Sequence, residues 1–124
     1  MPKTILVAED EPMILRILVF KLEMEGYRVL QAKTGPEVIE TLNGEKPDLI
    51  LLDATLPEMD SFTILQKIRS LDGSRELPVF MLTQTHKPWQ KEKALELGAN
   101  HCIVKPFKPT VVAKEIKNLF AKSP

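Results

Sequence analysis

The 124-residue sequence has a single cysteine, Cys102, so no disulfide can form within the chain. Its formal net charge is zero and it has no basic run, which argues against a general nucleic-acid-binding surface, because phosphate binding needs clustered Lys and Arg. No apolar stretch reaches membrane-spanning length, since residues 14–20 are interrupted by Arg16. The first residues show no signal-peptide pattern. We therefore expect a cytoplasmic protein without a membrane or nucleic-acid partner.

Glycine-rich phosphate-binding motifs are also missing. The sequence has neither a G-x-G-x-x-G motif nor a P-loop, which disfavours a nucleotide or flavin binder. It has no repeat, no low-complexity segment and no linker that marks a second domain. We expect residues 1–124 to form one domain.

Four short apolar runs end on side chains that can take part in chemistry. The runs are residues 5–8, 49–52, 79–82 and 103–104, and the side chains that follow are Glu9 and Asp10, Asp53, Thr83 and Lys105. Runs of this length, bounded by turn residues, are typical of buried strands in a parallel sheet. Ligands bind beyond the carboxyl ends of such strands, so the sequence predicts one site at that edge.

Helix-like segments separate the strands, as parallel strands require. We expect helices at about 12–25, 35–43, 60–70, 91–97 and 110–121, and a mixed edge-type strand at 27–32. In the first helix, one face carries Ile14, Ile17, Leu18 and Leu22. The predicted fold is α/β: a doubly wound, five-stranded parallel sheet of flavodoxin-like order 2-1-3-4-5, with five helices.

In that order the first and third strands are neighbours, which gathers Glu9, Asp10 and Asp53. Crowded carboxylates repel unless a cation joins them, and Mg²⁺ is the hard cation that uses few carboxylates together with phosphate oxygens. Asp53 is the candidate nucleophile, because carboxylates form acyl phosphates. Lys105 and the Thr83 hydroxyl can contact phosphoryl oxygens. Taken singly, each residue also fits a turn, a cap or a surface position; the set of four strand ends favours the functional interpretation.

The chain resembles a response-regulator receiver domain of two-component signalling. The matching segments are Ile5 to Glu11, Pro47 to Asp53 with Leu56 to Asp60, Pro78 to Thr83, and Leu97 to Ala99 leading to Lys105-Pro106-Phe107. The resemblance implies that Asp53 accepts a phosphoryl group from a phosphohistidine of a sensor histidine kinase or phosphotransfer protein. It implies Mg²⁺ held by Asp10, Asp53 and the Thr55 backbone carbonyl, with Glu9 acting directly or through water.

The resemblance also implies that Thr83 and Lys105 contact the phosphoryl oxygens, and that the Lys105-Pro106 peptide is cis. Such a domain is not an enzyme, beyond catalysing its own phosphorylation and dephosphorylation. Its downstream partner is expected on the face of the fourth helix, fifth strand and fifth helix. No output segment follows the last helix, so we expect a stand-alone receiver or a receiver from a longer chain.

Three positions depart from the family pattern. Cys102 stands three residues before Lys105, where the family usually has a tyrosine or phenylalanine that acts as a switch. Gln84 follows Thr83, where alanine or glycine is usual, and Ser61 follows Asp60, where glycine is usual. Cys102 and Gln84 motivate an alternative, a receiver-like interaction module that phosphorylation does not regulate. A phosphatase or phosphotransferase with an aspartyl nucleophile is disfavoured. Such enzymes generally need a second acidic residue two positions after the nucleophile, and here that position is Thr55. Trp89 is either half-packed or a partner anchor.

Overall fold

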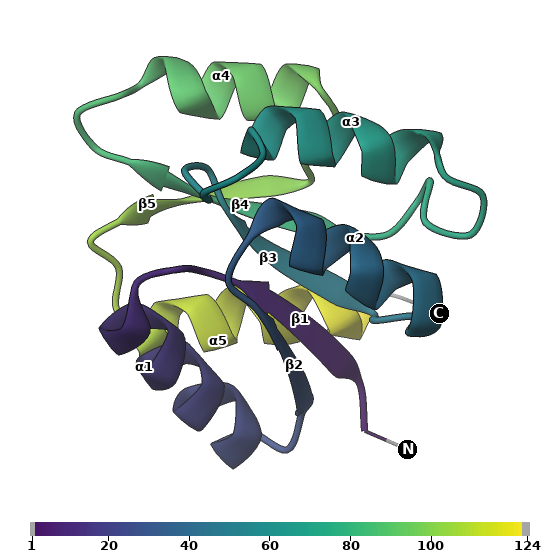
Figure 1. The fold of residues 1–124 in the computed structure, drawn as a ribbon. Helices are drawn as coiled ribbons and strands as arrows, with labels where there is room; N and C mark the ends of the chain where they lie inside the picture. Colours follow the sequence, from purple (N-terminus) through teal and green to yellow (C-terminus); the bar gives the residue numbers. More distant parts are fainter. Residues whose placement is uncertain (1, 123–124) are drawn as a thin grey trace.

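Five parallel strands form one sheet in the order β2-β1-β3-β4-β5 in the computed structural model, which describes residues 2–122 (Figure 1). The strands are β1 (Thr4–Ala8), β2 (Arg28–Ala32), β3 (Leu49–Asp53), β4 (Val79–Gln84) and β5 (His101–Lys105). The helices are α1 (Pro12–Met24), α2 (Gly35–Gly44), α3 (Ser61–Ser70), α4 (Trp89–Glu96) and α5 (Pro109–Lys122). The predicted fold class and strand order are confirmed.

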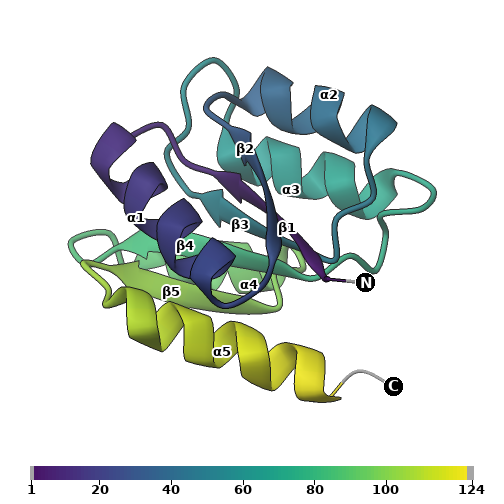
Figure 2. The ribbon, with the colours of Figure 1, turned by 90° about the horizontal axis from the view of Figure 1, so that it is seen from below.

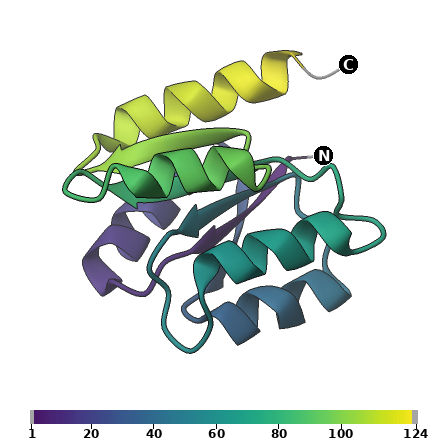
Figure 3. The same ribbon diagram turned by 90° about the horizontal axis from the view of Figure 1, so that it is seen from above.

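Helices cover both faces of the sheet. Figures 2 and 3 show α1 and α5 on one face and α2, α3 and α4 on the other. Side chains alternate along each strand, so in β1 Ile5 and Val7 pack with α1 and α5, whereas Leu6 and Ala8 pack with the other three helices. Burial on both faces explains why the central strands are continuous apolar runs. Within residues 2–122, no helix is long and apolar enough to cross a membrane.

The face that α1 presents to the sheet overlaps the predicted one but is shifted around the helix. Its buried residues are Leu15, Leu18 and Leu22, whereas Ile17 is 43% exposed and Ile14 is partly buried. Spacings of three and four residues place the three leucines on one stripe, and Ile17 lies outside it. Ile17 thus lies at the solvent edge of the predicted apolar face rather than in the buried stripe, and α1 carries surplus apolar surface toward solvent.

Two element ends near the β4–α4 connection also differ from expectation. The α4 helix begins at Trp89 rather than Lys91, directly after Pro88, whose backbone is already helical. The β4 strand continues past Thr83 to Gln84, because Gln84 still pairs with Lys105 of β5. The connection is therefore short, and both of its ends are fixed.

The start of α2 fixes the loop that follows β3. Gly35 N donates a hydrogen bond to Pro57 O at 3.3 Å. A Cβ atom on Gly35 would lie 2.5 Å from Cβ of Met59, so only glycine permits this approach. Asp60 caps α3 by accepting from Thr63 N at 3.1 Å. The loop is thus held from both sides beside the carboxyl end of β3.

Candidate functional site

The carboxyl ends of β1, β3, β4 and β5 meet at one edge of the sheet. Each neighbouring pair is parallel, with Ala8 beside Leu52, Asp53 beside Leu82, and Thr83 beside Val104. The residues predicted from the strand ends therefore lie together. A hollow of about 680 Å³ opens there, and its lining includes the carboxylates, Thr55, Gln84 and Lys105. Thr83 lies beside it in β4, with 1% of its surface exposed.

Three carboxylates form the acidic part of this site. One ligand oxygen each from Glu9, Asp10 and Asp53 lies within 4.8 Å of the others. Glu9 is fully buried and Asp53 is 1% exposed, while Asp10 is exposed toward solvent. An all-oxygen donor set with one side open to water suits Mg²⁺, which retains several water ligands. The residues present thus fit the expected metal ion.

Lys105 neutralises part of the buried negative charge. Its Nζ lies 2.7 Å from Glu9 Oε1 and 3.1 Å from Asp53 Oδ2. Burial alone lowers the pKa of Lys105, but the bond with Glu9 and the charges of both carboxylates outweigh it and raise that pKa. Burial, reinforced by Asp53, raises the pKa of Glu9 to about 7 even though Lys105 opposes the shift. The ammonium alone does not balance the carboxylates, which is the electrostatic condition that favours an added cation.

Thr55 orients the Asp53 carboxylate. Both its backbone N and its Oγ1 donate to Asp53 Oδ1, at 3.1 and 3.2 Å. Asp53 thus forms an Asx-turn, in which its side chain accepts a hydrogen bond from the backbone N–H two residues ahead. The other carboxylate oxygen, Oδ2, remains available to Lys105. The family resemblance implied a metal ligand at the Thr55 carbonyl, and the sequence analysis missed these two donor roles. The carbonyl's role stays a prediction.

The Thr83 hydroxyl is an unused polar group. Its Oγ1 is buried and has no hydrogen-bond partner among residues 2–122. A buried hydroxyl without a partner is costly, so a ligand oxygen in the hollow would satisfy it. Nearby, the peptide bond between Lys105 and Pro106 is cis, as the family resemblance implied.

Ser61, which replaces the usual glycine, tethers the loop after β3. Its side chain is 1% exposed, and its hydroxyl donates to Asp53 O at 2.6 Å while accepting from Leu56 N at 3.2 Å. The serine therefore satisfies two buried backbone groups through a hydroxyl that glycine does not have. The sequence showed the departure at Ser61 but not this bridge, because the bridge joins residues that meet only after folding.

We expect Ser61→Ala to lower the free energy of unfolding by about 1–3 kcal/mol, because Asp53 O and Leu56 N lose their buried partner. The measurement is urea denaturation at neutral pH. Ser70→Ala is the matched control, since Ser70 is exposed at the end of the same helix. Equal stability of the two variants would contradict the assigned role.

A glutamine pair joins the end of β4 to α4. Gln90, which sequence reasoning missed, is 1% exposed, and its Oε1 accepts from Gln84 N at 2.8 Å. Gln90 lies in a polar helical segment, so no pattern marked it as buried.

Cys102 is a small buried residue, as expected, and burial raises the pKa of its thiol. Trp89 is half-packed, with its ring centroid 5.8 Å from that of Phe62.

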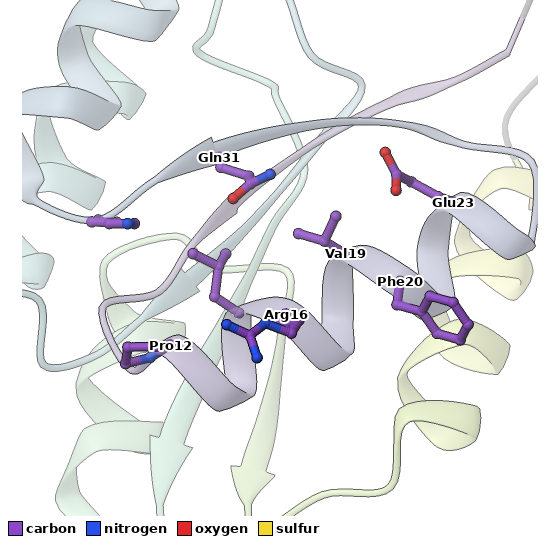
Figure 4. Close-up of a pocket in the computed structure, with 8 residues that line it drawn as sticks. Pro12, Arg16, Val19, Phe20, Glu23 and Gln31 are labelled. Atoms are coloured by element: carbon purple, nitrogen blue, oxygen red, sulfur yellow. The ribbon is translucent and has the colours of Figure 1, made fainter.

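A second hollow, of about 430 Å³, lies between α1 and β2. Figure 4 shows Arg16, Val19 and Glu23 on α1 and Gln31 on β2 around it. This hollow adjoins the acidic one at Pro12, which lines both. The side chains that could hold a metal ion, among residues 2–122, are the carboxylates of Glu9, Asp10 and Asp53, and none of them lines this second hollow. The chemistry therefore belongs to the edge of the sheet.

Comparisons with known proteins agree with this geometry. A family model described as the response regulator receiver domain matches residues 5–117. The chain is 37% identical over 123 residues to the alkaline phosphatase synthesis transcriptional regulatory protein PhoP of Bacillus subtilis (strain 168), covering 99% of this chain and 50% of that protein. It thus spans about half the length of the curated relatives it matches.

Solved structures show the same fold. A putative response regulator from Chloroflexus aurantiacus J-10-fl superposes with a TM-score of 0.93 at 30% identity, covering 98% of this chain and 100% of that one. The receiver domain of sensor histidine kinase PA1611 from Pseudomonas aeruginosa PAO1 has a TM-score of 0.87 at 27% identity, covering 95% and 97%; it has a magnesium ion coordinated in its active site cleft. From its sequence match, strand order and clustered carboxylates, the chain belongs to the response regulator receiver domain family.

Proposed function

We propose that Asp53 accepts a phosphoryl group from a phosphohistidine of a sensor histidine kinase or phosphotransfer protein, in a Mg²⁺-dependent reaction that changes partner binding. The observation that carries the proposal is the setting of Asp53: a buried carboxylate paired with Lys105 at 3.1 Å and clustered with Glu9 and Asp10. Carboxylates in such settings act as nucleophiles. We also propose that residues 1–124 work as one receiver domain in the cytoplasm.

In the transfer, an Asp53 carboxylate oxygen attacks phosphorus while the phosphorus–nitrogen bond of phosphohistidine breaks. The electron pair of that bond remains on the imidazole nitrogen, and the product is an acyl phosphate. Thr55 N and Oγ1 hold Oδ1 in place, so the carboxylate is oriented before the donor arrives. Mg²⁺ held by Asp10, Asp53 and the Thr55 carbonyl, with Glu9 directly or through water, would supply positive charge for the phosphoryl oxygens.

Two further side chains act on the phosphoryl group itself. Lys105, released in part from Asp53, pairs with one phosphoryl oxygen, and the Thr83 hydroxyl donates to another. We propose that the domain catalyses only its own phosphorylation and the later hydrolysis of the acyl phosphate, and otherwise acts as a signalling module.

Exposed apolar side chains support two contact surfaces. Around the acidic hollow, Ile14 and Pro106 also line a neighbouring groove with Ile17, Phe107 and Pro109. A phosphohistidine donor must reach Asp53 across this rim, so we place the donor there. The downstream partner is proposed on the face of α4, β5 and α5, where exposed apolar residues are Trp89, Leu95, Val104 and Val111.

The test is incubation of the protein with a small-molecule phosphodonor and Mg²⁺, followed by intact mass measurement. We expect a gain of one phosphoryl group per chain, and no gain when a chelator removes Mg²⁺. An unchanged mass in the presence of Mg²⁺ would refute the proposal.

The alternative is a receiver-like module whose binding ignores phosphorylation. The observation that favours it is the hydrogen bond from Gln84 to buried Gln90, which ties down the segment next to Thr83. Partner capture with and without beryllofluoride, a phosphoryl mimic, separates the two functions. Equal capture in both conditions supports the alternative, and a difference supports the phosphorylation switch.

A further inference from the structure

The Ser61 hydroxyl bridges the two ends of the turn that carries Thr55. The turn spans residues 53–56, and Ser61 Oγ donates to Asp53 O at 2.6 Å while it accepts from Leu56 N at 3.2 Å. A four-residue turn is often closed by a bond between its first carbonyl and its last N–H, and here a side-chain hydroxyl joins the two groups. Ser61 is 1% exposed, so this bridge lies out of competition with bulk water.

The bridge is anchored on the first residue of α3. Ser61 follows Asp60, which caps the helix, and precedes Phe62, which is 3% exposed and packs in the core. Farther along the loop, Gly35 N donates to Pro57 O at 3.3 Å. The cap and the Gly35 contact hold the later half of the loop, and the Ser61 hydroxyl ties its earlier half to α3.

Two groups that the proposed function assigns to Mg²⁺ lie in this turn: the Asp53 carboxylate and the Thr55 backbone carbonyl. Thr55 N and Oγ1 donate to Asp53 Oδ1 at 3.1 and 3.2 Å, so the position of one residue constrains that of the other. A change in the shape of the turn therefore changes the spacing of the two groups. Mg²⁺ demands short bonds in nearly octahedral geometry, whereas Ca²⁺ accepts longer and more variable ones. A loosened turn thus penalises Mg²⁺ more than Ca²⁺.

We propose, on the basis of the proposed function, that Ser61 is a positioning residue that gives the site its preference for Mg²⁺ over Ca²⁺. Its hydroxyl contacts neither the ion nor the phosphoryl group. It holds the turn 53–56 against α3 before the ion binds, so little backbone ordering remains to be done on binding. Without the hydroxyl the turn adjusts to the ion, which suits the flexible coordination of Ca²⁺ better than that of Mg²⁺.

The experiment measures the dissociation constants of Mg²⁺ and of Ca²⁺ by isothermal titration calorimetry, at neutral pH and at a temperature where every variant is folded. We expect the wild type to bind Mg²⁺ more tightly than Ca²⁺. Ser61→Ala and Ser61→Gly remove the hydroxyl and are expected to weaken Mg²⁺ binding by about tenfold, as the loss of outer-shell partners of a metal site does. Ca²⁺ binding is expected to weaken much less, so the preference for Mg²⁺ falls.

Ile68→Val is the matched control, because Ile68 is fully buried in the same helix and lies outside the loop. It is expected to lower stability, as the Ser61 variants do, but to leave both dissociation constants unchanged. A folded Ser61→Ala or Ser61→Gly variant with the wild-type preference overturns the proposal, as does a wild type that binds both ions equally well. The wild-type measurement keeps the proposal open to refutation even if a variant fails to fold.

Phosphoryl uptake separates this proposal from the function on which it rests. Intact mass after incubation of the wild type with a phosphodonor and Mg²⁺ tests Asp53 alone. Normal uptake together with an unchanged ion preference in the Ser61 variants refutes the role of Ser61 and leaves the proposed function standing. A wild type that neither binds Mg²⁺ nor gains a phosphoryl group refutes both.

Discussion

Asp53→Asn is expected to abolish phosphoryl uptake completely. The amide of asparagine is not a carboxylate nucleophile, so no acyl phosphate can form at this position. The substitution keeps the size of the side chain and an oxygen that can accept from Thr55 N and Oγ1. It also removes one of three clustered carboxylates, so the fold is expected to persist. Intact mass after incubation with a phosphodonor and Mg²⁺ checks the result.

Asp72→Asn is the control for this variant, since Asp72 is exposed and lies outside the acidic hollow. It is expected to gain one phosphoryl group as the wild type does. A mass gain in Asp53→Asn would show that another side chain is the acceptor. Thermal unfolding of the unphosphorylated proteins establishes that any loss is chemical rather than a failure to fold.

Lys105→Met is expected to lower the free energy of unfolding by about 3–5 kcal/mol in the presence of a chelator. Removing one partner of a buried ion pair leaves the opposite charges uncompensated. Here the loss affects Glu9 and Asp53 together, whose side chains are 0% and 2% exposed. Methionine keeps much of the length of lysine, so lost charge rather than lost packing dominates. Urea denaturation with chelator measures the effect.

Mg²⁺ is expected to restore part of the stability lost in Lys105→Met, because an added cation takes over the neutralisation of the same carboxylates. Lys108→Met, at an exposed position after β5, is the control and is expected to change stability by less than about 0.5 kcal/mol. A Lys105→Met variant as stable as this control, or one that ignores Mg²⁺, would contradict the electrostatic account of the site.

Much of the site could be predicted because it lies at strand ends. An apolar run followed at once by a polar residue indicates both a buried strand and the edge at which it stops. Glu9, Asp10, Asp53 and Lys105 carry that signal, and the structure brings their side chains together. Thr83 carries it as well and is buried in β4. Their chemical roles stay predictions that the experiments above test.

Other features left no trace in the local sequence. Ser61 and Asp53 are bonded, but eight positions separate them. Gln90 is buried within a polar segment because β4 ends against it. Ile17 fits the periodicity of α1 yet is 43% exposed, since the sheet selects the stripe that contains Leu15, Leu18 and Leu22. In each case a neighbour distant in sequence decides the environment.

The alternation of strands and helices, the five-stranded order and the residues at which the central strands end could all be predicted from the amino-acid sequence, because hydrophobic periodicity and chain connectivity act locally. The pairing of side chains became visible in the folded chain alone: Lys105 pairs with Glu9 and Asp53, Ser61 with the end of β3, and Gln90 with Gln84. Pairing depends on distances of a few ångströms between segments far apart in the chain. Those distances are set by packing across the sheet, which periodicity does not encode.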